Sequence, residues 1–307
     1  MRDDLAPSQG SADAPGSVHA SRFRVGGVSV QLAGFRKADV ALVPSLEPFR
    51  VEGGISDIHV QVEWAPSLRT AAGCELFDSG SVWRLYRVES GFQFDFSVPL
   101  LGGNPYSRLL VDEEFCRCSL LLSAECLASR EPTAPLEYPL DELLITHRLT
   151  QERAVELHGV GIVGPNGASN LFVGHSGAGK STTARLWTAQ EDVEILSDDR
   201  IILREHSGQI FMYGTPWHGE AAFASPASAP AQRICILEHG QGNELTRLSQ
   251  SQAVAELFAR SFVPFHRHEY VDSALAFLQH VAGSVPCYRY SFEPDHRAVE
   301  RMLTFCD

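Results

Sequence analysis

A run of residues in the second half of the chain has the types and spacing of a phosphate-binding loop. Residues 174–181 read G-H-S-G-A-G-K-S, which fits the pattern G-x-x-x-x-G-K-S. Glycines permit a tight turn that leaves backbone N–H groups pointing inward. Lys180 would reach the outer phosphates of a bound polyphosphate, and the Ser181 hydroxyl would hold Mg²⁺. The residues predicted to line this phosphate site are Gly174, His175, Ser176, Gly177, Ala178, Gly179, Lys180, Ser181 and Thr182.

A strand and a helix must position such a loop. Residues 170–173 are typical of a short buried strand, and residues 181–187 are typical of the first turns of a helix. The helix N-terminus would add unpaired N–H donors and a partial positive charge. The alternative is a glycine-rich turn with a chance lysine, which the two flanking elements disfavour.

Two adjacent carboxylates follow the next predicted strand. Residues 193–196 read V-E-I-L, and Asp198 and Asp199 come directly after Ser197. Ligands of open α/β sheets bind at the carboxyl ends of strands. Phosphoryl transfer needs a divalent ion and a group that positions or deprotonates the acceptor. Because neighbouring side chains of an extended chain point to opposite faces, the pair could divide these tasks. We assign the base to Asp198 and the metal ligand to Asp199, although either could take either part and a polar strand end is the alternative.

Composition excludes some classes of partner. The 307 residues carry a formal net charge of −13, which argues against nucleic acid and against an anionic membrane surface. No apolar run approaches the length of a membrane span, and the N-terminus lacks the apolar segment of a secretory signal. The seven cysteines form no C-x-x-C pair, which is typical of reduced thiols. We therefore expect a cytoplasmic protein.

The chain divides into three parts. Residues 1–20 are rich in Ser, Ala, Asp, Pro and Gly and are expected to be a disordered tail. Residues 21–135 contain short alternating runs punctuated by glycine and proline, which predict a β-rich domain without identifiable chemistry. Residues 131–135 look like a linker. Residues 136–307 carry the phosphate loop among alternating helical and strand patterns, which predicts an α/β domain.

Three segments together carry a resemblance to a known family. His-Gly-Val at 158–160, the loop at 174–181 and Leu-Ser-Asp-Asp at 196–199 are similar in order and spacing to the C-terminal domain of the HPr serine kinase/phosphorylase family. That domain is related to ATP-dependent phosphoenolpyruvate carboxykinase. The similarity covers roughly residues 140–240. It implies a phosphate-loop kinase domain of the HPr-kinase/carboxykinase type, preceded by a smaller β-rich (α+β) domain.

The resemblance also implies an activity and its cofactors. The donor would be ATP, with Mg²⁺ held by Ser181 and an aspartate, and the acceptor would be a serine hydroxyl of a protein or peptide. His158 would lie near the phosphates, or would be a strand-end histidine satisfied by the backbone. Members of the family often form hexamers, so the chain could be a homo-oligomer.

The chain also departs from the family. The segment Glu-Ile-Arg-Gly has no clear counterpart, and residues 213–231, rich in small residues, stand in its place as a possible lid. Within it, His218 and Glu220 could contact phosphate or metal or act as a base, or could belong to a plain turn. Arg200 could neutralise a transferring phosphate or be an exposed strand-end arginine.

These departures make HPr a doubtful substrate and bring the chain closer to divergent relatives, including kinases that phosphorylate a lasso-peptide precursor. The other readings are a small-molecule kinase or carboxykinase relative, and a nucleotide-binding regulator without catalysis.

Overall fold

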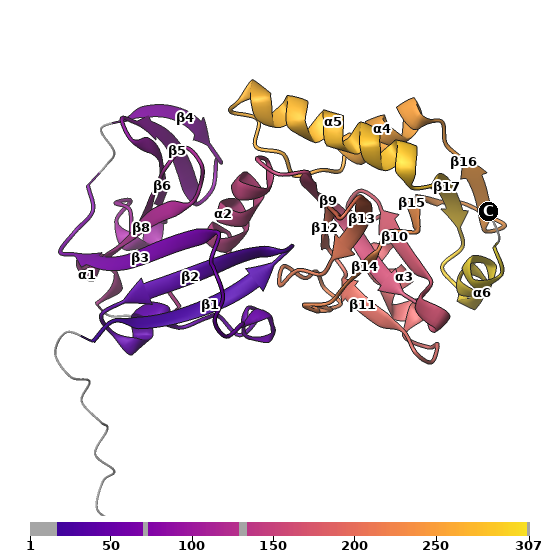
Figure 1. The fold of residues 1–307 in the computed structure, drawn as a ribbon, viewed down its shortest axis with the longest axis horizontal. Coiled ribbons are helices and arrows are strands. Elements are labelled where there is room, and N and C mark those ends of the chain that lie inside the picture. The colour runs from indigo at the N-terminus through magenta and orange to yellow at the C-terminus, as the bar shows by residue number, and fades with distance from the viewer. Residues whose placement is uncertain (1–16, 70–72, 129–133, 306–307) are drawn as a thin grey trace, which may run out of the picture.

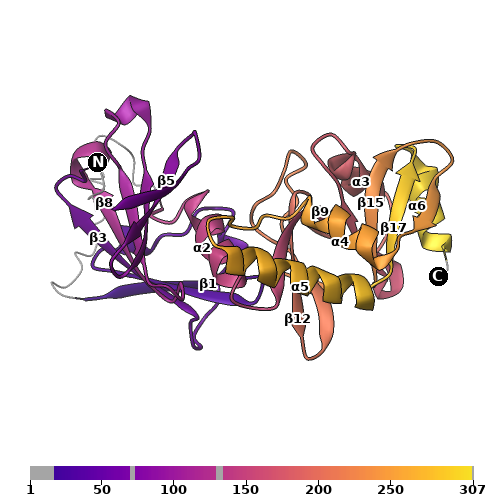
Figure 2. The same ribbon diagram turned by 90° about the horizontal axis from the view of Figure 1, so that it is seen from above.

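The computed structural model describes residues 17–69, 73–128 and 134–305 of the chain. Two lobes lie side by side along the long axis of the molecule in both views (Figures 1 and 2). Strands from residues 19–123 form one lobe, and strands from residues 154–292 form the other. The protein belongs to the mixed α/β class, with sheet predominating over helix.

The first lobe is an eight-stranded sheet within the described residues, in the order β1-β2-β3-β8-β7-β6-β5-β4. Its strands are β1 His19–Val25, β2 Val28–Gly34, β3 Ile58–Ala65, β4 Cys74–Asp78, β5 Trp83–Val88, β6 Gly91–Phe96, β7 Ser107–Val111 and β8 Arg117–Ser123. Phe92, Phe94 and Phe96 alternate along β6 and are buried in the core of this lobe, as their period-two spacing predicts.

The helix that follows the strands of the first lobe packs into the core of that lobe. A single turn, α1 (Ala124–Leu127), follows β8, and the longer helix α2 spans Leu140–Leu149. The apolar side chains of α2 belong to the same buried cluster as the strands of the first sheet. The sequence analysis placed this helix in the second domain, whereas its packing ties it to the first. Its polar face is thereby carried to the junction between the lobes.

The second lobe is a nine-stranded sheet, in the order β14-β13-β12-β9-β10-β15-β17-β16 with β11 paired to β9, again counted over the described ranges. Its strands are β9 Ala154–Val163, β10 Ser169–Val173, β11 Glu194–Ser197, β12 Arg200–His206, β13 Gln209–Tyr213, β14 Ser228–Pro230, β15 Arg233–His239, β16 Glu244–Arg247 and β17 Cys287–Phe292. β10 and β11 both run antiparallel to β9, on its two sides. Their carboxyl ends therefore meet at one edge of the sheet, with β9 between them.

Helices cover both faces of the second sheet. They are α3 Lys180–Trp187, α4 Gln250–Phe258, α5 His268–Ser284 and α6 His296–Thr304. Side chains of α4 and α5 share one buried cluster with the sheet, and those of α3 and α6 share another. Leu171 and Phe172, adjacent on β10, enter opposite clusters because successive strand side chains alternate. A capping box formed by Ser249 and Gln252 begins α4.

Several sequence expectations differ from the structure. The sequence pattern of residues 154–163 predicts strands and a turn, but these residues form one continuous strand, β9, because apolar neighbours on both sides let its glycines stay extended. β1 begins at His19, inside the predicted tail of residues 1–20, and the rest of that tail up to residue 16 lies outside the described residues. Residues 131–133 of the predicted linker also lie outside them. β7 and β8 were not predicted.

The helices were also compared with the length of a membrane span. Among the described residues, no helix combines the length and the apolar character that crossing a bilayer requires.

Candidate functional site

The predicted phosphate loop, called the loop below, connects β10 to α3. Gly177 and Gly179 adopt φ of 80° and 99°, values that side chains with a Cβ rarely take. A Cβ added to Gly179 would meet the Phe292 ring at 2.4 Å, so glycine is required there by space as well as by conformation. The carbonyl of Gly177 lies 2.8 Å from Nε2 of His239, at the end of β15, which braces the loop. Sequence reasoning did not identify His239, because nothing in its local sequence indicates the contact.

Lys180 is folded onto its own loop. Its Nζ donates to the carbonyl oxygens of Gly174 at 3.1 Å and His175 at 3.0 Å. The residue is only 6% exposed, and burial lowers the pKa of the ammonium to about 8, although the charge of Asp199 raises it. An ammonium has three N–H donors, and two of them have carbonyl partners here. The Lys180 ammonium is thus held at the loop with donor capacity left for an anionic ligand.

The register of the sheet brings the loop and the aspartates together around β9. The N–H of Gly174 donates to the carbonyl of His158, and the N–H of Gly159 donates to the carbonyl of Asp199. His158 is also the register partner of Arg200 on β12. The start of the loop and the residues after β11 therefore lie on the two sides of one point of β9. The sequence predicted both strand ends but not that β9 lies between them.

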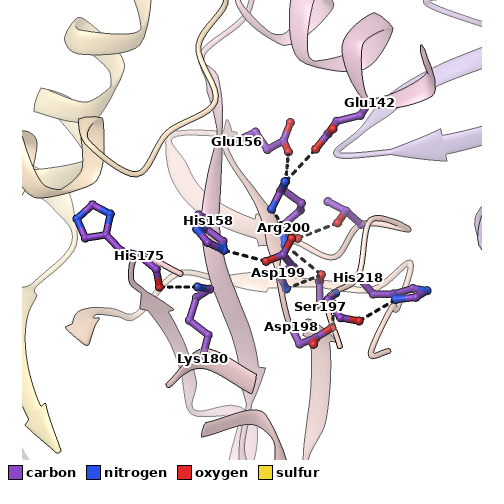
Figure 3. Close-up of polar contacts among 12 residues, drawn as sticks. Glu142, Glu156, His158, His175, Lys180, Ser197, Asp198, Asp199, Arg200 and His218 are labelled. Carbon is purple, nitrogen blue, oxygen red and sulfur yellow. Dashed lines mark hydrogen bonds and ion pairs between the residues drawn. The ribbon is translucent and has the colours of Figure 1, made fainter. Parts of the chain in front are cut away.

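Asp199 is the centre of a polar network (Figure 3). Its Oδ1 accepts a hydrogen bond from His158 Nε2 at 2.8 Å, and its Oδ2 forms an ion pair with Arg200. Burial acts to raise the pKa of Asp199, but the hydrogen bond from His158 and the positive charges of Arg200 and Lys180 outweigh it. The pKa of this carboxyl is consequently below its ordinary value, and the group is ionised near neutral pH.

Arg200 is held from several sides and is not an exposed strand-end arginine. Its Nε lies 2.8 Å from Glu142 of α2 and 3.4 Å from Glu156 of β9, and its guanidinium stacks 4.0 Å from the centre of the Phe262 ring. Burial, together with the neighbouring Glu142, holds the pKa of Glu156 well above its usual range. The two glutamates were missed in the sequence, since they come from separate elements. They fix Arg200, and Arg200 in turn orients Asp199.

Asp198 faces away from the loop. Its Oδ1 accepts from the amides of Gly219 (3.0 Å) and Phe223 (3.2 Å), and its Oδ2 accepts from the amide of Ala221 (2.9 Å). The residue is 1% exposed. The two aspartates point to opposite sides, as expected, but the carboxylate that was predicted to be the base is occupied in holding the segment 219–223. This geometry assigns Asp198 a structural part and leaves Asp199 facing the phosphate loop.

A cavity of about 430 Å³ lies between the loop and Asp199. Its walls are His158, Ser176, Gly177, Gly179, Lys180, Ser181, Thr182, Arg185, Asp199, Gly219 and Glu220. Of the predicted phosphate-site residues, Gly174, His175 and Ala178 do not line it, and the His175 side chain is exposed. His218, predicted to be catalytic, does not line it either and is exposed, with Nδ1 3.1 Å from the carbonyl of Gly219. The residues around the cavity bring together an ammonium, a guanidinium, three hydroxyls and two carboxylates.

The donors of this cavity are compatible with Mg²⁺. The Ser181 hydroxyl and the Asp199 carboxylate are hard oxygen donors, and Mg²⁺ in nucleotide sites takes one or two protein ligands and completes its shell with phosphates and water. Among the described residues, no three His, Cys, Asp or Glu side chains are arranged so that together they could hold a metal ion.

Comparisons with known proteins give no family for this chain. No model of a protein family matches the sequence, and no curated protein matches it. The case for function therefore rests on the geometry of the site.

Proposed function

We propose that this protein is a Mg²⁺-dependent phosphotransferase of the HPr-kinase-related type, which transfers the γ-phosphoryl group of ATP to a serine hydroxyl of a protein or peptide. The observation that carries the proposal is the cavity in which Lys180 and Ser181 of a phosphate loop face Asp199 with its His158 and Arg200 partners. A phosphate loop alone would fit a simple nucleotide-binding protein. A phosphoryl-transfer enzyme also needs an oriented, ionised carboxylate across the cavity from the loop, and Asp199 meets this need.

Each wall of the cavity has a part in this reaction. The inward N–H groups of the loop and the Lys180 ammonium would bind the phosphates. Ser181 and Asp199 would hold Mg²⁺, which when bound gathers negative charge from the phosphates. His158 and Arg200 keep the Asp199 carboxylate in one orientation and ionised. Since transfer of a phosphoryl group passes through a loose transition state, positioning matters more than the strength of the base.

The proposed step balances as follows. The acceptor hydroxyl oxygen forms a bond to the γ-phosphorus, and the bond from that phosphorus to the oxygen bridging to the β-phosphate breaks. ADP leaves with the electron pair, and the hydroxyl proton passes to water at the mouth of the cavity. Use of ATP fits the cytoplasmic location expected from the sequence.

The proposal is tested with γ-labelled ATP, Mg²⁺ and a synthetic library of peptides in which one serine is flanked by randomised residues. We expect label in peptides with the wild-type protein and none with Lys180→Ala or Asp199→Asn, each checked for folding by circular dichroism. Binding of ATP without any turnover in the wild type would favour the nucleotide-binding regulator instead. Label transferred at the wild-type rate by Lys180→Ala would refute the assignment of the loop.

A further inference from the structure

A second cavity adjoins the first on the far side of Asp199. It encloses about 240 Å³. Its walls are Ser45, Tyr138, Asp141, Asp199, Arg200, Pro216, Trp217 and His218. Asp199 lines both cavities, so a group in the second cavity can meet a phosphate in the first at this carboxylate.

The segment 216–220 forms the partition between the two cavities. Gly219 and Glu220 line the first cavity, which lies between the loop and Asp199 and is called the phosphate cavity below. Trp217 and His218 line the second cavity. Hydrogen bonds to two buried aspartates, Asp198 and Asp141, hold this segment in place.

Asp198 accepts the three backbone N–H groups of residues 219, 221 and 223, and Asp141 of α2 accepts from Trp217 Nε1 at 2.9 Å. The segment that the sequence suggested as a mobile lid is thus a fixed wall at residues 217–223.

The outer wall of the second cavity comes from the first lobe. Ser45 precedes the short helix Glu47–Phe49 of that lobe. The two lobes are locked together where the β1–β2 turn meets β12. Arg204 Nη1 donates to the carbonyl of Gly26 at 2.9 Å, and a Cβ on Gly26 would lie 2.6 Å from Ile202. These contacts hold the first lobe against β12, and Ser45 of that lobe lines the same cavity as His218.

The interior of the second cavity suits an uncharged polar group. The charges of Asp199 and Arg200 are paired with each other. Asp141 is 1% exposed, and burial raises its pKa to about 7 even though the hydrogen bond from Trp217 lowers it. Its Oδ1 has no hydrogen-bond partner of good geometry, although the Glu142 amide lies near enough to lower the pKa. A buried oxygen without a partner costs free energy that a ligand donor could recover.

We infer that this second cavity receives the acceptor serine of a peptide and that the first lobe, through Ser45, forms part of the acceptor site. The inference rests on the proposed function. The serine hydroxyl enters beside Arg200 and meets the terminal phosphate next to Asp199, while the flanking peptide crosses the mouth between Ser45 and His218. The β-rich lobe thus has a role in substrate selection, which its sequence did not reveal.

The experiment fills the cavity from both walls. Ser45→Trp and His218→Trp are compared with Ser67→Trp, an exposed serine of the same lobe that does not line the cavity. For each variant, kcat/KM for the serine-peptide library and Kd for ATP are measured. We expect both cavity variants to lose about 100-fold in kcat/KM for peptides, the scale of a misplaced reactant, while their Kd for ATP and that of Ser67→Trp stay at the wild-type value.

The outcomes separate the inference from the proposed function. Peptide phosphorylation that is undiminished in both cavity variants would overturn the inference and leave the proposed function standing. ATP binding by the wild type with no peptide labelled would overturn the peptide acceptor. A wild type that does not bind ATP would remove the proposed function itself. ATP affinity also reports whether a variant is folded. If one of the two cavity variants no longer binds ATP, the other one decides the test.

Discussion

The different parts assigned to Asp198 and Asp199 give the sharpest prediction. Asp198→Asn keeps an oxygen that can accept from Gly219 and Phe223, but places an amide N–H₂ where Oδ2 now accepts from Ala221. One charge-assisted hydrogen bond is lost and a buried amide loses its partner. Each hydrogen bond to a charged group contributes about 1.5–3 kcal/mol, so we expect the free energy of unfolding to fall by about 2–3 kcal/mol.

Asp199→Asn is the matched control at the neighbouring position. The Asp199 side chain is 27% exposed, and Arg200 keeps its glutamate partners when the charge of Asp199 is removed. Part-exposed ion pairs contribute about 1 kcal/mol or less. We therefore expect Asp199→Asn to remain close to wild type in stability while it loses phosphoryl transfer.

The assay is thermal unfolding followed by tryptophan fluorescence, with urea unfolding as a second probe. A loss of 2–3 kcal/mol corresponds to a fall in Tm of roughly 4–12 °C in Asp198→Asn. ATP turnover is measured on both variants below their unfolding range. If Asp198→Asn is as stable as wild type, or if Asp199→Asn is the less stable of the two, the division between a structural and a catalytic aspartate is wrong.

Three further predictions concern the cavity. The pKa of Lys180 is lowered to about 8, so the fold disfavours its protonated form. ATP affinity should therefore weaken as pH rises above about 8, and ATP binding should take up protons, which calorimetry in two buffers would measure. The free energy of unfolding should rise with pH between about 8 and the pKa of Lys180 in the unfolded chain, which unfolding at several pH values would measure. His158→Ala removes a hydrogen bond that lowers the pKa of Asp199, so the acidic limb of the pH–rate profile should move to higher pH, and an unmoved limb would contradict this link. Gly179→Ala would place a Cβ at a residue with φ of 99° and only 2.4 Å from the Phe292 ring, so the loop should distort and ATP binding should be lost. Wild-type ATP affinity of this variant in a fluorescence titration would contradict the requirement for glycine.

The sequence predicted the local elements around the loop and missed how they are joined. The strand before the loop, the helix after it and the strand before Asp198 all have strong local patterns, and β10, α3 and β11 are found there. That β9 lies between them depends on pairing over distances in sequence that no local pattern encodes. The opposite directions of Asp198 and Asp199 followed from strand geometry. Which of them faces the phosphate loop depends on the later segment 219–223.

Residues from other elements were beyond the reach of motif reasoning. Glu142 and Glu156 look like ordinary surface acids of a helix and a strand. The packing of α2 brings Glu142 to Arg200, and the pairing of β9 with β12 brings Glu156 there. Ser45 has no signal at all in its own sequence. Conversely, His175 and His218 were proposed from their neighbours in sequence, and their side chains lie outside the phosphate cavity.

The most direct measurement of the central claim is a crystal structure with Mg²⁺ and a non-hydrolysable ATP analogue. The account predicts the phosphates within the loop, the Lys180 ammonium moved from its two carbonyl partners onto them, and the metal between Ser181 and Asp199. An analogue bound elsewhere, or bound in the loop with Asp199 turned away from its terminal phosphate, would contradict it.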